Sequence, residues 1–155
     1  MDQAPAQRTP LIDELPPDVR EHLQPHLTRA VFAPGDVILR EGLATPFLAV
    51  VVRGHVALRI LVPERGPITI LTAEPGDLIG WSAVVPPYRS TSTAVAVEPT
   101  ELAVVEAATL RRLLGEDVGL AASLLPFLLA TVSRRLSASW LQLLDLFGRS
   151  QVDPW

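Results

Sequence analysis

The sequence predicts a mainly β fold with some α structure, a jelly roll or barrel with one helix before it and a long helix after it. Short apolar segments separated by turn residues fill residues 29–106. In one segment the apolar side chains occupy every second position: Val56, Leu58, Ile60 and Val62. Such alternation is typical of a half-buried strand. Many short strands with frequent turns indicate a jelly roll or barrel.

The expected elements follow from spacing and turn chemistry. Leu11 to Leu27 is predicted to be partly helical, because Pro16-Pro17 suits a first helical turn. The expected strands are 29–33, 37–41, 47–53, 55–62, 67–73, 91–97 and 101–106. Pro34-Gly35-Asp36 and Pro75-Gly76-Asp77 look like one type II turn used twice, since proline presets the first φ and glycine takes the positive φ.

Two helices are expected after the strands. Ala107 to Leu114 forms a short one, and Asp117 is the expected N-cap of the last one. We expect Pro126 to kink or restart that helix and Gly148 to end it.

The last helix carries an apolar stripe at steps of three and four. Its members are Leu125, Leu129, Val132, Leu136, Trp140, Leu143 and Phe147, widened by Leu128, Leu141 and Leu144. One domain covers only part of such a helix, so we expect the stripe to form a homodimer seam. The alternative is a helix that folds wholly onto its own barrel.

Composition excludes several kinds of function. The chain of 155 residues has no cysteine, which excludes disulfides, zinc–cysteine sites and thiol catalysis. Its 13 basic residues are all arginine, so there is no Schiff-base or P-loop lysine. The formal net charge is −4 and basic runs are no longer than pairs, so we expect no nucleic-acid partner. The pairs Arg111-Arg112 and Arg134-Arg135 are interpreted as solvated helix faces.

The chain is expected to form a single domain at residues 11–148, between tails at 1–10 and 149–155. The barrel occupies about 29–106 and the C-terminal helices about 107–147. The N-terminus lacks the apolar segment of a signal peptide. The most apolar stretch, Val118 to Val132, is too short to span a bilayer. We therefore expect a cytoplasmic protein with no membrane partner and no resident cofactor.

The stretch from Glu74 to Val97 contains the candidate binding site. Gly80 has no Cβ, so its backbone can approach another group closely. If Trp81 to Val84 form one helical turn, its free N–H groups favour an anion. The guanidinium of Arg89 can bind phosphate or carboxylate through two parallel hydrogen bonds. The side chains of Ser90 to Thr93 add hydroxyl groups beside it. Together these residues predict a cradle for one phosphate-sized anion.

An alternative role for Arg89 is purely structural. The guanidinium could instead pair with Glu74 or Asp77 of this chain and tie the loop down.

With these residues in place, the chain resembles the cyclic nucleotide-binding domain family. These are the sensor domains of catabolite activators, of cAMP-dependent kinase regulatory subunits and of cyclic-nucleotide-gated channels. The resemblance covers about residues 11–147. Residues 32–42 and 47–56 are similar to the opening barrel strands, residues 75–90 to the phosphate-binding cassette, and the final helix to the dimerisation helix.

One group within this family is especially similar. Gly80-Trp81-Ser82, the segment 85–89 and the ending 140–147 resemble short stand-alone bacterial members. We expect no helix-turn-helix domain for reading DNA, so any output passes to a partner chain, or there is no output.

The resemblance implies that a cyclic nucleotide or another phosphate-bearing ligand binds to Gly80, Trp81, Ser82, Arg89 and Ser90. Family members place a glutamate after the cassette glycine, where it accepts the ribose 2′-hydroxyl, and here that residue is tryptophan. Indole has an N–H donor and no acceptor, so it cannot take that role. It fills part of the sugar or base site, or it stacks on a base.

The resemblance also makes Trp140 a candidate ligand contact, because the final helix of the family can reach the ligand. The alternative is that Trp140 belongs to the core or to the dimer seam.

Three functions are compatible with these features. The first is a regulatory sensor without catalytic residues, in which ligand binding shifts the final helix and changes a partner surface. The second is a ligand-free dimeric module with an unidentified protein partner, in which Trp81 plugs the pocket. The third, a metal enzyme on a similar barrel, requires clustered histidines, and only His55 lies on an expected strand. We therefore expect no metal site.

Overall fold

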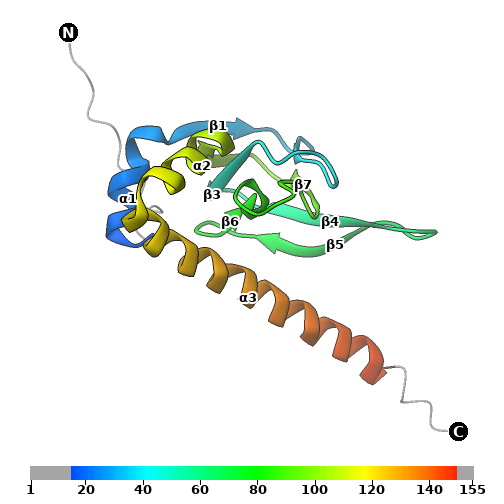
Figure 1. Cartoon of the computed structure of the whole chain (residues 1–155). Coiled ribbons are helices and arrows are strands. Elements are labelled where there is room, and N and C mark those ends of the chain that lie inside the picture. Colours follow the sequence, from blue (N-terminus) through cyan, green and yellow to red (C-terminus); the bar gives the residue numbers. More distant parts are fainter. Residues whose placement is uncertain (1–14, 150–155) are drawn as a thin grey trace, which may run out of the picture.

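Two four-stranded antiparallel sheets pack face to face and form the body of the molecule (Figure 1). This computed structural model describes residues 15–149. The first sheet has the order β1 (Thr28–Phe32), β8 (Thr100–Glu106), β3 (Phe47–Arg53) and β6 (Leu78–Ile79). The second has the order β2 (Val37–Leu39), β7 (Thr93–Ala96), β4 (Val56–Val62) and β5 (Gly66–Ala73). The predicted jelly-roll fold is confirmed.

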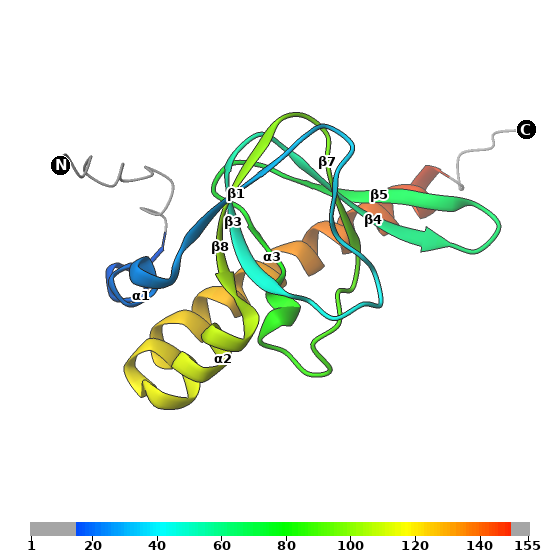
Figure 2. The same ribbon diagram turned by 90° about the horizontal axis from the view of Figure 1, so that it is seen from above.

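Helices cover one end of the sandwich and run along one side of it. The helix α1 (Pro17–Leu23) and the 3₁₀ turn η2 (Gln24–His26) precede the strands. A second 3₁₀ turn, η3 (Trp81–Ala83), follows β6. The helices α2 (Ala107–Glu116) and α3 (Val118–Arg149) come last. Figure 2 shows that α1 and α2 lie at the same end, where α3 begins, and that α3 then runs in the direction of the β4–β5 hairpin.

The sequence located most elements within a few residues. It missed β6, which is only two residues long, and it predicted a longer N-terminal helix than α1. Of the predicted kink or restart at Pro126, the restart is wrong, because α3 runs without a break through that residue. The helix also continues one residue past Gly148. The predicted tail 1–10, residues 11–14 and residues 150–155 lie outside the described residues. The first residue of the predicted tail 149–155 belongs to α3.

The strand β3 separates two hydrophobic cores. Its side chains point alternately to opposite faces, as strand geometry requires. Leu48 and Val50 join a cluster beneath the helices, and Ala49 and Val51 join the cluster between the sheets. A strand buried on both faces reads as a continuous apolar run, which explains the sequence from Leu48 to Val51.

The two Pro-Gly-Asp turns adopt the same conformation, as predicted. Gly35 has φ +88° and Gly76 has φ +95°, the values that a type II turn demands of its third residue. In each turn the aspartate carboxylate accepts a backbone N–H three residues earlier, Asp36 from Ala33 and Asp77 from Glu74, at 2.8 Å in both cases. The carboxylate of Asp77 therefore has a structural role within its own turn.

One face of α3 packs against the domain and the rest is exposed. Leu120, Leu124, Leu128 and Thr131 are buried at steps of four, four and three. From Leu136 to Asp145 every residue is exposed. The predicted seam residues Leu125, Leu129, Leu136, Trp140 and Leu143 are all exposed in the single chain, and Val132 is half-buried. The side chain of Phe147 lies outside what the structure describes.

The apolar stretch is longer than the sequence analysis predicted. Over Val118–Asp145, α3 is long and apolar enough to cross a membrane by length and composition alone. Its first half, however, contributes Leu120, Leu124 and Leu128 to the core beneath the helices. The first half of α3 therefore packs against the rest of the domain.

The start of α3 is tied to α1. Asp117 Oδ1 accepts the N–H of Leu120 at 3.0 Å, which confirms the predicted N-cap. Asp117 Oδ2 lies 3.1 Å from His22 Nε2. His22 Nδ1 lies 2.6 Å from the Asp18 carbonyl oxygen, and this hydrogen bond, followed by the charges of Asp117, Glu21 and Asp18, raises the pKa of His22.

This arrangement predicts a pH-dependent stability. Folding raises the pKa of His22, so the protonated imidazole stabilises the folded state. This stabilisation is fully present below the unfolded pKa of about 6.5 and is lost as pH rises through the folded pKa. We expect the melting temperature to fall over that window, and His22→Gln to reduce the slope. The pKa of His55 is raised by its hydrogen bond to Glu98, so part of the slope persists in the variant. An unchanged slope in His22→Gln would contradict the assignment; differential scanning calorimetry across pH measures it.

Candidate ligand pocket

A tight turn at Gly80 sets the position of the candidate site. Gly80 precedes η3 with φ +79°, a left-handed conformation that glycine adopts without strain. A Cβ at this position would lie 2.3 Å from the carbonyl oxygen of Phe47. The turn is thus held close against β3 by both conformation and space. The expectation of a helical turn after Gly80 is met by η3, which is three residues long.

The second half of the cassette segment (residues 75–90) pairs with the loop after β2. Ser90 accepts the N–H of Gly42 at 2.8 Å and donates its own N–H to Leu43 at 2.9 Å. The Thr45 N–H donates to the Tyr88 carbonyl at 2.9 Å. Thr45 and Ser90 also share a buried hydroxyl–hydroxyl hydrogen bond of 2.7 Å. These bonds keep Ser90 at the pocket wall while the residues around it are exposed.

Arg89 lies outside the pocket. Its side chain is exposed, and Nη1 donates to the Gly42 carbonyl oxygen at 2.8 Å. Neither Glu74 nor Asp77 forms an ion pair with it among the described residues. Arg89 therefore neither lines the cavity nor pairs with the carboxylates that the alternative named.

A small cavity lies between the cassette segment, the sheet interior and α3. The residues that line it are Leu39, Leu58, Ile79, Gly80, Trp81, Ser82, Ser90, Thr91, Ser92 and Arg135. It has room for water-sized molecules over about 20 Å³. One water needs about 10–15 Å³ in this measure, so the cavity holds one or two waters. Of the residues predicted to bind ligand, it brings together Gly80, Trp81, Ser82 and Ser90.

Arg135 reaches this cavity from α3, which the sequence analysis did not foresee. Arg135 is half-buried, so the prediction of a solvated face at this residue is wrong. Burial lowers the pKa of its guanidinium, the charge of Asp77 opposes this, and Arg134 adds to the lowering. The signal in the sequence was its spacing: Arg135 follows Leu128 and Thr131 by seven and four residues, on the buried face of the helix.

Arg111 connects α2 to the cassette segment. Its Nη1 donates to the Ala83 carbonyl at 2.9 Å, and its guanidinium lies 4.5 Å from the centre of the Tyr88 ring. The prediction of a solvated face is therefore wrong for Arg111 as well. It ties η3 and the following loop to the helix that leads into α3.

Trp140 does not reach the cavity. It is 61% exposed and is not among the residues that line the cavity. No group of three His, Asp or Glu residues in the described part of the chain could hold a metal ion.

The family can now be assigned. A model of the cyclic nucleotide-binding domain matches residues 29–117, which span the strands, the cassette segment and α2. The chain belongs to the cyclic nucleotide-binding domain family. No curated protein matches the sequence.

Solved structures of this family have the same architecture. A cyclic nucleotide-binding domain from Methylobacillus flagellatus superposes with a TM-score of 0.77 at 21% identity, covering 88% of this chain and 80% of that one. The N-terminal domain of a transcriptional regulator from Streptomyces coelicolor gives 0.63 at 27% identity, covering 84% and 90%. The catabolite activator protein of Thermus thermophilus gives 0.67 at 27% identity, covering 90% of this chain and 63% of that one.

The close approach at Gly80 predicts a selective loss of stability. Gly80→Ala should lower the free energy of unfolding by about 1–3 kcal/mol more than Gly66→Ala, because a Cβ at Gly80 collides with Phe47. Gly66 is a matched control, with φ +80° and no atom within 4 Å of a built Cβ. Urea denaturation of both variants measures the difference. Equal losses would mean that the backbone contact at Phe47 is not a constraint.

Proposed function

We propose that this protein is a regulatory sensor without catalytic activity, which binds a nucleotide or another phosphate-bearing small ligand in the cavity beneath the cassette segment. The observation that carries the proposal is the composition of the cavity wall. Gly80, Trp81, Ser82 and Ser90 form one side, and Arg135 of α3 forms another. A ligand in this cavity therefore contacts both the cassette segment and the final helix.

The small size of the cavity supports a coupling between ligand binding and movement of α3. Room for one or two waters does not admit a nucleotide, so entry of one requires residues that line the cavity to move, and Trp81 and Arg135 of α3 are among them. Because α3 is a single continuous helix, a shift beside the cavity also displaces its exposed half. Such a displacement is the signal that we propose.

The exposed half of α3 is the proposed output surface. Ten consecutive residues, from Leu136 to Asp145, are exposed, and five of them are large and apolar: Leu136, Trp140, Leu141, Leu143 and Leu144. Exposed apolar surface of this extent marks an interaction site. We propose a homodimer through this helix in the cytoplasm, with a further protein partner as the receiver of the signal.

A second function is supported by the same pocket. Trp81 lines the cavity, and Arg89 is bound to a carbonyl of its own chain. Both features fit a ligand-free dimeric module in which Trp81 plugs the pocket. The two functions differ in whether any ligand stabilises the folded protein.

A thermal-shift screen distinguishes the sensor from the ligand-free module. The compounds are cAMP, cGMP, cyclic dinucleotides, AMP, ATP and inorganic phosphate. A ligand at about 100 times its Kd adds about 2.7 kcal/mol to stability, which raises the Tm of a domain of this size by about 5–10 °C. The sensor function predicts such a rise with at least one compound. No rise with any of them at millimolar concentration would favour the ligand-free module.

Variants of Trp81 sharpen this test. Trp81→Glu restores the carboxylate that family members present to the ribose 2′-hydroxyl, and should strengthen cAMP binding at least about tenfold, the effect of one charged hydrogen bond. Trp81→Ala is the matched control, because it frees space without adding an acceptor. Equal affinities in the two variants would indicate that space alone limits binding.

The dimer seam makes a separate prediction. Leu129 and Leu143 are 70% and 52% exposed in the single chain, so Leu129→Glu with Leu143→Glu should convert the dimer into a monomer by placing charges in the seam. Leu61→Glu is the control, because Leu61 is 69% exposed but lies on β4. Light scattering coupled to gel filtration gives the mass. If the parent protein has the mass of one chain, the predicted dimer seam is wrong.

A further inference from the structure

A second cavity lies at the end of the first sheet where β1 and β3 begin and β8 ends. Its volume is about 350 Å³, against about 20 Å³ for the cavity beside the cassette segment. Sites for small molecules commonly measure about 300–1,000 Å³. Residues from η2, β1, β3, β8 and α2 line it, and among the described residues none lines both cavities. The second cavity is therefore a separate feature of the fold.

Three neighbouring strands form the floor of this second cavity. Their register places Phe47 opposite Glu106 and Thr28 opposite Val104. Val104 and Glu106 are two residues apart on β8, so their side chains share one face of the sheet. Val104 is buried in the core between the two sheets, and Phe47 packs against that core. The floor is thus the apolar edge of the inter-sheet core, with a carboxylate directly across from an aromatic ring.

Backbone contacts fix this floor in place. The Ala107 N–H donates to the Pro46 carbonyl oxygen at 2.9 Å, which joins the start of α2 to the start of β3. The turn at Gly80 lies so close to the Phe47 carbonyl oxygen that it leaves no room for a Cβ. A site that is already ordered binds its ligand without an ordering cost.

Polar side chains around the floor are available to a ligand. Within the described part of the chain, His26, Glu106 and Thr109 form no hydrogen bond or ion pair through their side chains. Glu106 is exposed, and the other two are half-buried. A carboxylate accepts hydrogen bonds, whereas a hydroxyl or an imidazole can donate or accept them. The cavity therefore combines an apolar floor with a small number of uncommitted polar groups.

The charge of the lining favours a cation. Among the described residues that line the cavity, Glu106 is the only acid and none is arginine. An ammonium group beside Glu106 is stabilised by the carboxylate and, over the Phe47 ring, by the negative face of the aromatic system. The N-terminus of α2 favours an anion in the same region. However, its first N–H is already bonded to Pro46, and Glu106 itself places a negative charge there.

We propose that this cavity is a second binding site, which takes a small organic cation: an amine that carries an aromatic or branched apolar group. The ammonium group lies between Glu106 and the Phe47 ring, and the apolar group lies on Val104. His26 and Thr109 provide hydrogen-bonding groups at the rim. The site does not depend on the sensor function, because the cassette cavity takes no part in it.

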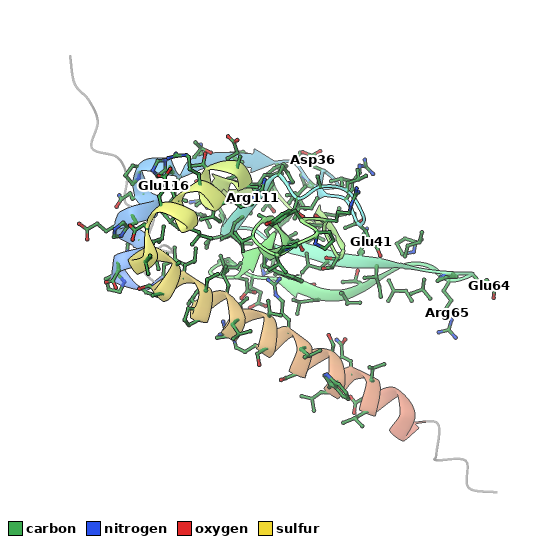
Figure 3. The ribbon with its side chains drawn as sticks, viewed as in Figure 1. Asp36, Glu41, Glu64, Arg65, Arg111 and Glu116 are labelled. Carbon is green, nitrogen blue, oxygen red and sulfur yellow. The ribbon has the colours of Figure 1, made fainter. Side chains whose placement is uncertain are left out.

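An NMR titration of the isotope-labelled full chain with benzylamine, at constant pH and ionic strength, tests this site. We expect a Kd on the order of 1 mM, as is typical for a ligand of this size, and the largest shifts at amides around the cavity. Benzyl alcohol has nearly the same shape without the charge and should bind about fivefold more weakly. Glu106→Gln should weaken benzylamine binding about three- to tenfold. Glu64→Gln, at the tip of the β4–β5 hairpin, is the matched control and should leave it unchanged (Figure 3).

Thr28→Phe is a second test that leaves every charge in place. Thr28 is exposed at the start of the edge strand β1, and phenylalanine suits a strand, so the added ring should fill the cavity while the fold is retained. We expect this variant to lose the benzylamine shifts. The spectrum itself verifies folding, and Glu106→Gln decides the matter if Thr28→Phe unfolds.

Three results would overturn the proposal. The first is the absence of shifts around the cavity at high millimolar benzylamine, or shifts that persist unchanged in Glu106→Gln and Thr28→Phe. The second is equal affinity for benzyl alcohol, because recognition would then be purely apolar. The third is a preference for phenylacetate over benzylamine, because the N-terminus of α2 would then bind an anion.

Discussion

The position of α3 against the sandwich depends on one apolar contact. Leu120, Leu124 and Leu128 are buried together with Val19 of α1 and Leu110 of α2. Full burial of each leucine contributes about 1.5–3 kcal/mol, so this contact outweighs any single polar interaction near the pocket. Because the helix is rigid, the contact also sets where Arg135 lies, two turns beyond Leu128. Hydrophobic packing earlier in α3 therefore determines which residue of this helix lines the cavity.

The polar residues of the cassette segment are arranged by hydrogen bonds to the loop after β2. Those bonds hold Ser90 at the cavity and direct Arg89 outward to Gly42. Trp81 takes the place of the glutamate that family members use to accept a hydroxyl, and so the cavity lacks that acceptor. The pocket wall combines donors from two elements far apart in the sequence, and its positive charge comes from the helix rather than from the loop.

Arg111 joins these two parts. Its hydrogen bond to Ala83 and its contact with the Tyr88 ring tie the cassette segment to α2, and α2 leads directly into α3. A displacement of η3 by a ligand would therefore act on α3 both across the cavity and through α2. The charged tip of the β4–β5 hairpin, with Glu64 and Arg65, lies far from this connection (Figure 3). Arg111 thus connects η3 with α2, which leads into α3.

The sequence by itself determined the fold class, most strands, both Pro-Gly-Asp turns and the Asp117 cap, because each depends on local chemistry: alternation, turn residues and a side chain beside its own helix. It also identified Gly80, Trp81, Ser82 and Ser90, which lie close together in the chain and line one cavity. The tertiary structure alone decided the roles of three arginines. Arg89 faces outward, whereas Arg111 and Arg135 contact the cassette segment and the cavity. The physical reason is that a long, flexible charged side chain takes its partner from whatever the packing of distant elements places within reach, and no local pattern encodes that partner.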